Sequence, residues 1–406
     1  MADVDDVDDV DGPACLTWCE VSEGALAANV RAFRGRLGDG VQLGVVVKAD
    51  AYGHGLVVAS RAFVRAGVDW LVCNALHEAE ALRAAGITVP IYVVGYVPAA
   101  AAAAVVRADV RLVVYDRAVV EALAAAGKAA GRVVPVHVKV ETGNHRQGLE
   151  LPEALALGRR VQALAEAGGG VRLEGISTHY ADIEDTTDHR FALGQVARFE
   201  EAVRAFREAG LAVPVPNTAN SAATILWPRT HAALVRVGIS AYGLWPSTET
   251  FAAALALPEA RGGRGGFVPA LVPALSWRAR IAQVKEVPAG AWVGYGRTFR
   301  ATHAMRVAVL PIGYHEGYDR RLSNVGHVLI DGIRAPVRGR VCMNMVMVDV
   351  TDIPSARAGG VATLLGNDGR GGDERVSAEE VARWMGSINY EVVSRIHPSV
   401  PRVLVS

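Results

Sequence analysis

Short apolar segments alternate with amphipathic segments through the first part of this 406-residue chain, and this alternation limits the fold more than any other feature. It is typical of parallel strands joined by crossover helices. No Gly-x-Gly-x-x-Gly motif follows the first strand, so a closed (β/α)8 TIM-type barrel is favoured over a dinucleotide-binding sheet. Besides the strand before Lys48, we expect strands at 17–21, 70–73, 91–94, 110–115, 134–140 and 173–177. We expect helices at 22–37, with Ser22 as N-cap, and at 56–66, 75–85, 99–107, 118–126, 151–167 and 191–209.

The pattern changes after a Gly- and Arg-rich stretch at 261–266, which we interpret as a linker or loop insertion. Apolar residues then recur with period two, which predicts a mostly antiparallel β domain. We expect strands at 275–284, 306–311, 327–330, 335–341 and 345–348, a hairpin turn at Asp331-Gly332, and one helix at 378–385. The glycine-rich loop at 367–373 has no helix after it, so we assign it no phosphate role.

Three regions are therefore expected. Residues 1–14 form a disordered acidic tail, 15–258 the (β/α)8 barrel, whose first strand could pair with the C-terminal domain, and 259–406 the β-rich domain. The 42 basic and 42 acidic residues balance, which gives no general attraction to nucleic acid or anionic lipid. No apolar run approaches the roughly 18 residues of a membrane span. The four scattered cysteines form neither a metal cluster nor a disulfide framework, which favours a reducing cytoplasm.

Lys48 stands in the segment Val-Val-Val-Lys-Ala-Asp-Ala-Tyr-Gly-His-Gly at 45–55, at the C-terminal end of an apolar strand. Burying an ammonium group without a partner is costly. One interpretation is a lysine that extends its amine to solvent. The other is an amine whose pKa is lowered by desolvation, so that it can form a Schiff base. The spacing alone does not separate the two.

This segment resembles the cofactor-lysine motif of the alanine racemase family, enzymes that carry pyridoxal 5'-phosphate (PLP) on the lysine. The resemblance implies Lys48 as the cofactor lysine and Tyr52 as a hydroxyl that reaches the cofactor phosphate. Racemisation removes a proton from one face of the substrate carbon and returns one to the other, so two acid–base groups are needed. Lys48 would be the first.

Tyr295, in Val-Gly-Tyr-Gly-Arg-Thr-Phe at 293–299, is the candidate for the second base. A tyrosine between two glycines is by itself more typical of a turn. The segment nevertheless resembles the family motif whose tyrosine acts in the active site of the neighbouring subunit, which implies a head-to-tail homodimer. Because a phenol ionises near pH ~10, a cationic neighbour would have to lower its pKa.

Three further segments resemble family motifs around the cofactor. Arg236, which alone would suggest a surface ion pair, matches the arginine that faces the pyridine nitrogen. An arginine does not readily give up its proton, so that nitrogen should stay unprotonated, which should limit side reactions such as transamination. His179 matches a histidine that packs against the ring; alone it would suggest a core or strand-end residue. The resemblance assigns the phosphate to Asn220, Ser221, Gly238 and Ile239.

The segment at 139–148 resembles the family pattern Lys-x-Asp-Thr-Gly-x-x-Arg-x-Gly. It implies Arg146 near the substrate carboxylate and Lys139 as a lysine that is often carbamylated. The segments around Tyr314 and Met343 resemble blocks that line the substrate end from the partner subunit, Met343 through its backbone. Departures from the family pattern are Glu141, Asn144, His145, Asn344 and Pro398, the last two in place of an aspartate and a tyrosine.

The sequence thus predicts a PLP-dependent racemase that interconverts L- and D-alanine by a two-base mechanism, without a metal, and supplies D-alanine for the cell wall. The departures leave open a racemase of the same fold that acts on serine or on a broader set of amino acids. An alternative of another class is a non-catalytic PLP-binding or homeostasis protein, but related proteins of that kind resemble the barrel alone and lack the second domain.

Overall fold

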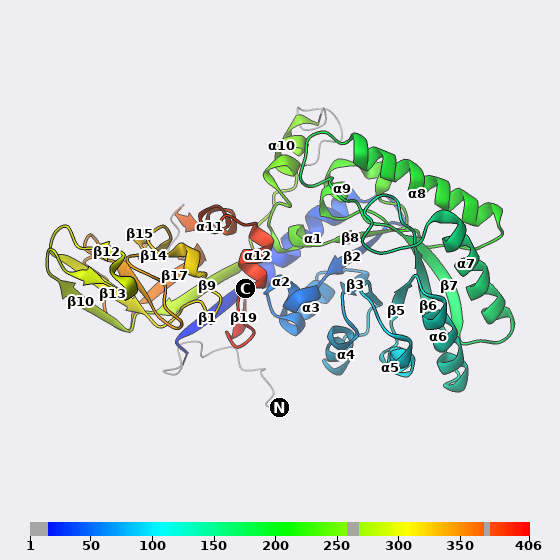
Figure 1. Ribbon diagram of the computed structural model, residues 1–406, viewed down its shortest axis with the longest axis horizontal. Helices are drawn as coiled ribbons and strands as arrows, with labels where there is room; N and C mark the ends of the chain where they lie inside the picture. Colours follow the sequence, from blue (N-terminus) through cyan, green and yellow to red (C-terminus); the bar gives the residue numbers. More distant parts are fainter. Residues whose placement is uncertain (1–14, 258–267, 369–373) are drawn as a thin grey trace. The chain divides into compact units, whose positions relative to one another are not determined.

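The computed structural model describes residues 15–257, 268–368 and 374–406, and its two compact units are described separately (Figure 1). One unit comprises Met1–Ala25, Asp50–Ala59 and Pro273–Ser406, and the other Leu26–Ala49 and Ser60–Val272. The expected acidic tail, the linker at 261–266 and most of the loop at 367–373 lie outside the described residues. Among the helices that are described, none has the length and apolar character that crossing a membrane requires.

The second of these units, the barrel unit, contains a curled parallel sheet in the order β7-β6-β5-β4-β3-β2-β8. Asn217 forms parallel bridges to Ser177 of β7 and to Leu234 of β8, so a single residue stands in for the eighth strand and closes the ring. This confirms the predicted (β/α)8 barrel. Its strands are β2 (Gln42–Val46), β3 (Trp70–Cys73), β4 (Ile91–Val93), β5 (Arg111–Val114), β6 (Val134–Lys139), β7 (Val171–Ser177) and β8 (Leu234–Val237).

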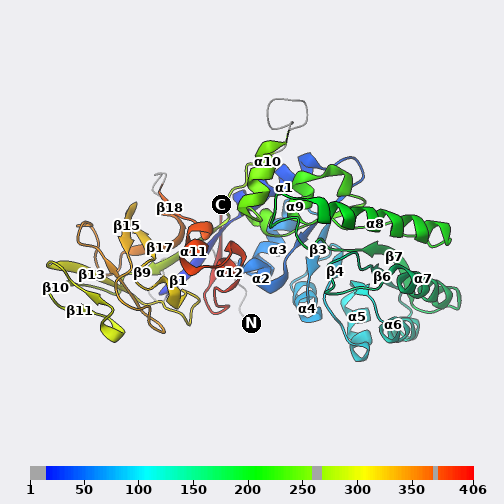
Figure 2. The same ribbon diagram turned by 45° about the horizontal axis from the view of Figure 1, so that its top comes forward.

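Helices cover the outside of this ring, as Figures 1 and 2 show for α4 to α8. Their apolar faces pack on strands that are buried on both sides, which explains the continuous apolar runs in the sequence. The Ser22 hydroxyl accepts the Ala25 N–H at 3.2 Å, as expected for the N-cap of α1. The helices that lie wholly or mainly in this unit are α1 (Glu23–Arg36), α3 (Leu56–Arg65), α4 (Leu76–Ala84), α5 (Ala102–Ala108), α6 (Arg117–Ala129), α7 (Leu151–Glu166), α8 (Arg190–Glu208), α9 (Ser221–Leu226) and α10 (Thr248–Ala256), whereas most of α2 (Lys48–Tyr52) belongs to the other unit.

The other unit, the β unit, is mostly antiparallel, as predicted. Its largest sheet has the order β15-β14-β17-β9-β1-β19, in which only the pair of β1 (Thr17–Ser22) with β19 (Arg402–Val405) is parallel. A second sheet has the order β10-β13-β16. The remaining elements are β9 (Leu275–Arg280), β10 (Gln283–Val287), β11 (Trp292–Val293), β12 (Phe299–Arg300), β13 (Met305–Leu310), β14 (His327–Ile330), β15 (Ile333–Pro336), β16 (Val346–Asp349), β17 (Val361–Asn367), β18 (Arg375–Val376), α11 (Ala378–Met385) and α12 (Asn389–Ser394).

The β unit also corrects several boundaries. The single strand expected at 275–284 is two strands in different sheets, because Ile281 bonds to Gly360 and the next residue, Ala282, bonds to Val309 of β13. The strand expected at 335–341 starts earlier and ends at Pro336, and β11, β12, β17, β18, β19 and α12 were not predicted. The Asp331-Gly332 hairpin is confirmed: both residues have positive φ, 52° and 79°, as a two-residue type I′ turn requires.

Candidate active site

Lys48 lies at the carboxyl end of the barrel strands, two residues after β2 ends. The turn that follows is left-handed: Ala49, Asp50, Ala51 and Tyr52 have φ values of 55°, 54°, 53° and 52°. Left-handed helical geometry costs roughly 1–2 kcal/mol per non-glycine residue, so surrounding contacts must hold this turn.

Glu78, on the first turn of α4, supplies one of those contacts. Its buried carboxylate accepts the Ala49 N–H at 2.7 Å, the Asn74 N–H at 2.8 Å and the Ala75 N–H at 2.9 Å. One side chain therefore fixes both the backbone next to Lys48 and the start of α4. Glu78 is not among the residues predicted from the sequence. The available signal was a glutamate three residues after Ala75, where the helix was expected to begin, because a glutamate at that spacing from the N-cap is a capping residue.

The Lys48 amine makes no hydrogen bond or ion pair with any other described residue, and the side chain is half-buried. Burial lowers its pKa below the usual value, and the nearby charge of Arg146 lowers it further, while Glu78 and Glu184 oppose the shift. A larger share of the amine is thus uncharged at neutral pH, which favours the nucleophile interpretation over a lysine that extends to solvent.

Arg236, on β8, is buried and points along the barrel wall rather than to the surface. Its guanidinium donates to the Asn217 side-chain oxygen, to the Thr178 carbonyl at 2.9 Å and to the Thr218 carbonyl at 3.3 Å. Within the described residues no carboxylate lies at ion-pair distance from it. The interpretation of Arg236 as a surface ion-pair residue is therefore wrong. Its guanidinium is a buried cation that neutral oxygens hold in place.

The segments predicted to bind a phosphate meet around α9. The Ser221 hydroxyl accepts the Gly238 N–H at 2.9 Å, which leaves its own hydrogen free to donate. Asn220 caps α9 by accepting the Ala223 N–H at 3.0 Å, and its amide donates to Glu184 at 2.7 Å. Ile239 begins the 3-10 turn Ile239–Tyr242, and Ser240 in that turn has a buried hydroxyl without a hydrogen-bond partner among the described residues.

Lys139, Arg146 and His179 lie together beside these groups and line a small pocket that also includes Glu141, Asn144, Gln147 and Thr178. Burial and the charges of Arg236 and Arg146 hold the pKa of Lys139 well below its usual range. The pKa of His179 is also well below its usual range, through burial and then through Lys139 and the neighbouring cations, so its imidazole is neutral. The fixed charges of Arg146 and Arg236 at the barrel end therefore disfavour further positive charge on Lys48, Lys139 and His179.

Glu141, one of the departures, opposes the lowering of the Lys139 pKa by its charge but forms no ion pair with these described cations. Its carboxylate accepts the backbone N–H groups of Gly143 at 2.5 Å and Asn144 at 2.6 Å, and such bonds lower its pKa although burial opposes them. The side-chain amide of Asn144 lies 3.5 Å from the carbonyl of His179. The replacement thus ties the carboxylate to the loop that carries Arg146.

The β unit carries the other predicted residues. Tyr295, Tyr314 and Met343 are 73%, 40% and 56% exposed. The blocks around the last two are joined by hydrogen bonds from Tyr314 N–H to the Cys342 carbonyl and from His315 N–H to the Met343 carbonyl, both at 3.0 Å. Tyr52, also in this unit, is buried with its ring 6.0 Å from that of Tyr390.

Gly294 and Gly296, which flank Tyr295, have φ values of 73° and 71°, so the expected unusual backbone geometry is present. A Cβ on Gly296 would lie 3.1 Å from the guanidinium carbon of Arg340, which brings a cation close to the Tyr295 loop. The sequence analysis did not select Arg340.

The two departures in the β unit differ in how far the structure accounts for them. The Asn344 amide donates to the Glu316 carboxylate at 2.6 Å. An aspartate there would place two carboxylates side by side, so the neutral amide has a local reason. Pro398 offers no hydroxyl, and nothing in its surroundings explains it.

No cluster of three or more potential metal ligands occurs in the described part of the chain.

The chain matches the family model "Alanine racemase, N-terminal domain" over residues 21–246 and the model "Alanine racemase, C-terminal domain" over residues 274–404. An alanine racemase from Desulfovibrio desulfuricans is 40% identical over 388 residues, which cover 96% of this chain and 98% of that protein.

Two solved structures are similar to this chain along nearly the whole length of both proteins. The alanine racemase of Streptomyces lavendulae has a TM-score of 0.86 at 34% identity and covers 97% of this chain and 98% of its own. That of Bartonella henselae, described with covalently bound pyridoxal phosphate, has a TM-score of 0.79 at 24% identity and covers 96% of this chain and 100% of its own. The second likeness concerns the fold alone.

Proposed function

Because the chain belongs to the alanine racemase family, and is therefore an amino-acid racemase, we propose that it interconverts L- and D-alanine on PLP with two bases, Lys48 and the partner subunit's Tyr295. The observation that carries the proposal is the Lys48 amine. It has a lowered pKa, it has no partner among the described residues, and the charge of Arg146 acts on it.

The residues at the barrel end fit PLP. The cofactor brings a phosphate, and the Ser221 hydroxyl has a hydrogen to donate beside the backbone of Gly238. Arg236, held by neutral oxygens, would face the ring nitrogen and keep it unprotonated, and neutral His179 would pack against the ring. Asn220, Ile239 and Tyr52 would complete the phosphate site. When bound, PLP supplies an electron sink for the carbon that loses its proton.

Within this arrangement, each protein group has a defined task. The uncharged Lys48 amine can accept the substrate's α-proton from one face, because its pKa is lowered. Arg146 forms no hydrogen bond or ion pair with another described residue, and its charge lowers the pKa of Lys48, Lys139 and His179. Its guanidinium would hold the substrate carboxylate. The phenol of Tyr295 would serve the opposite face.

The exposure of Tyr295 supports a homodimer in which each subunit completes the other's site. Tyr295 is 73% exposed on the β unit, and the segments that carry it and its companions expose further large side chains, namely Trp292, Tyr314, Met343 and Met345. Large exposed apolar side chains of this kind are typical of an interaction surface. Tyr314 and Met343 would then line the partner's substrate pocket.

Lys139 fits a carbamylated lysine. Its amine is buried among Arg236 and Arg146, and an uncharged amine is the form that reacts with carbon dioxide. A carbamate would replace a disfavoured cation with an anion beside Arg146. Protein exposed to ¹³C-labelled bicarbonate should show a carbamate signal by ¹³C NMR that is lost in Lys139→Met. Equal signals in the two proteins would contradict the assignment.

We also propose a cytoplasmic enzyme that supplies D-alanine for the cell wall, in keeping with four free cysteines. The test of the activity is loss of the α-proton signal in heavy water, followed by proton NMR, with PLP and a panel of L-amino acids. Selective exchange on L-alanine, with D-alanine accumulating, is the expected result. Equal exchange on L-serine would replace it with a broader racemase and implicate Pro398, and a PLP-loaded protein that exchanges nothing would refute catalysis.

A further inference from the structure

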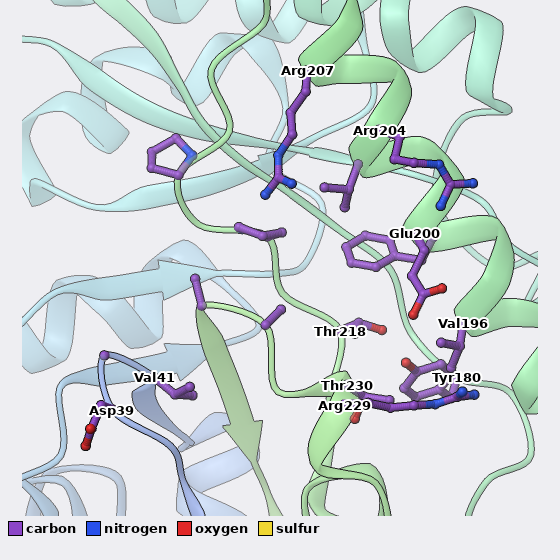
Figure 3. A pocket seen from close by; sticks show the side chains of 17 residues that line it. Asp39, Val41, Tyr180, Val196, Glu200, Arg204, Arg207, Thr218, Arg229 and Thr230 are labelled. Carbon is purple, nitrogen blue, oxygen red and sulfur yellow. The ribbon is translucent and has the colours of Figure 1, made fainter.

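The barrel unit contains a second cleft, of about 560 Å³, in the size range of small-molecule sites. It lies on the outer side of the barrel wall, between α8 and the segments that lead into β2 and β8. Figure 3 shows Glu200, Arg204 and Arg207 on α8 along one side, Arg229 and Thr230 beside Tyr180 at another, and Asp39 and Val41 opposite. None of the residues assigned above to the cofactor or substrate lines it.

Three guanidinium groups line this cleft, those of Arg204, Arg207 and Arg229. None of them forms an ion pair or hydrogen bond with another described residue. Glu200 lies one helical turn before Arg204 and can offset its charge. Asp39 adds a second carboxylate to the lining, so the three guanidinium groups leave one positive charge in excess.

The floor of the cleft supplies a second, independent feature. Tyr180 and Thr218 are 3% and 2% exposed, and their hydroxyls interact with each other without a hydrogen bond of full geometry, while neither has another partner among the described residues. Buried hydroxyls usually have a full partner, because leaving one without it is costly. Apolar side chains complete the lining, namely Val41, Val196, Phe199, Pro214 and Pro216.

We propose that this cleft binds an organic carboxylate with an apolar body, such as an aryl- or branched alkyl-carboxylate. Arg207 and Arg229 bind the carboxylate, the Tyr180 and Thr218 hydroxyls donate to it or to a polar substituent, and Val196 and Phe199 pack on the body. A carboxylate accepts hydrogen bonds from both kinds of donor, which a neutral or cationic ligand could not do as well.

The position of the cleft connects it to the candidate active site. Thr218 lines the cleft with its side chain, while its carbonyl accepts a hydrogen bond from Arg236 on the inner side of the wall. Asn217, the preceding residue, accepts a second bond from Arg236. A ligand in the cleft therefore contacts the segment that fixes Arg236, although binding itself does not depend on the function proposed above.

The test is isothermal titration calorimetry of the PLP-loaded protein with 3-phenylpropionate, and with phenethylamine and inorganic phosphate as comparison probes. We expect one 3-phenylpropionate per chain. The double variant Arg207→Ala/Arg229→Ala should weaken it about tenfold or more, because charge-assisted bonds are lost. Val203→Trp, which fills the cleft from α8, should do the same. The matched control Arg107→Ala removes an exposed arginine from α5 and should leave binding unchanged.

Each other outcome would overturn the proposal. Binding that survives both the double variant and Val203→Trp would locate the carboxylate elsewhere, for example at Arg146. Phenethylamine binding as tightly as 3-phenylpropionate would exclude selection for an anion. If phosphate binds with the same dependence on Arg207 and Arg229 while 3-phenylpropionate does not bind, the cleft is an inorganic anion site. No saturable binding of any probe would leave the cleft without a ligand function.

Discussion

Replacing Glu78 with glutamine tests how the chain holds Lys48 in position. One Glu78 oxygen accepts the Ala49 N–H, and the other accepts the N–H groups of Asn74 and Ala75. Glutamine has nearly the same shape but only one acceptor oxygen. The remaining oxygen best serves the pair Asn74 and Ala75, so the new NH₂ group would face the Ala49 N–H, donor against donor.

The expected cost follows from these contacts. A hydrogen bond to a charged group contributes about 1.5–3 kcal/mol, and a buried donor left without a partner costs about 1–3 kcal/mol. Because Glu78 is only 8% exposed, solvent can relieve little of this loss. We therefore expect Glu78→Gln to lower the free energy of unfolding by about 3 kcal/mol. Glu78 also raises the pKa of Lys48, so its loss should lower that pKa further.

Urea unfolding at fixed protein concentration measures the first effect, and the pH dependence of α-proton exchange measures the second. Glu80→Gln is the matched control, because Glu80 is exposed on the same helix and should change stability by less than about 0.5 kcal/mol. The acidic limb of the pH profile should move to lower pH only in Glu78→Gln. Equal stability of the two variants, with superimposable pH profiles, would refute the positioning role.

Three other changes give separate tests. Gly53→Ala should destabilise the protein by about 3 kcal/mol or more in urea unfolding, because Gly53 has φ 79° and an added Cβ would lie 1.9 Å from the Val393 carbonyl oxygen. The control Gly67→Ala, at φ 88° but with open space around the added Cβ, should cost about 1 kcal/mol. Equal costs for the two variants would contradict the predicted clash with Val393. Burial lowers the pKa of His54 from 6.5 to about 4. Below pH 6.5 the unfolded chain therefore binds more protons than the folded one, and the free energy of unfolding decreases as the pH is lowered. Between pH 7 and pH 5 the loss should be about 2 kcal/mol, and a variant His54→Gln that keeps the same slope would exclude His54 as its source. Tyr295→Phe should reduce racemisation about 10²- to 10⁴-fold with unchanged urea unfolding and PLP absorbance, and wild-type turnover would sink the two-base mechanism.

Much of the barrel could be predicted because its strands are buried on both faces and its helices are amphipathic, so hydrophobic periodicity follows the fold directly. The exception is the eighth strand, reduced to the bridges of Asn217, which no run of apolar residues marks. In the β unit, the division between β9 and β10 depends on the partners of Ile281 and Ala282, which are Gly360 and Val309. Pairing with residues so distant in sequence leaves little local signal.

The candidate site shows the same limit. Family resemblance singled out Lys48, Arg236 and Ser221, but their polar partners are set by the fold. The carboxylate of Glu78 reaches Ala49 from another βα unit, and the carbonyls that hold Arg236 have no side-chain signature. The positive φ values from Ala49 to Tyr52 were equally invisible, because these residue types ordinarily avoid that geometry.

The central claim, that Lys48 and Tyr295 act together from opposite subunits, is tested most directly by mixed dimers. Lys48→Ala and Tyr295→Phe chains with different affinity tags are co-expressed, and only dimers that carry both tags are purified. Each mixed dimer would have one site with neither base and one with both, so we expect about half of the wild-type activity per dimer. If the two bases belong to one subunit, no site in the mixed dimer is intact. Activity no higher than that of the single variants would then contradict the account.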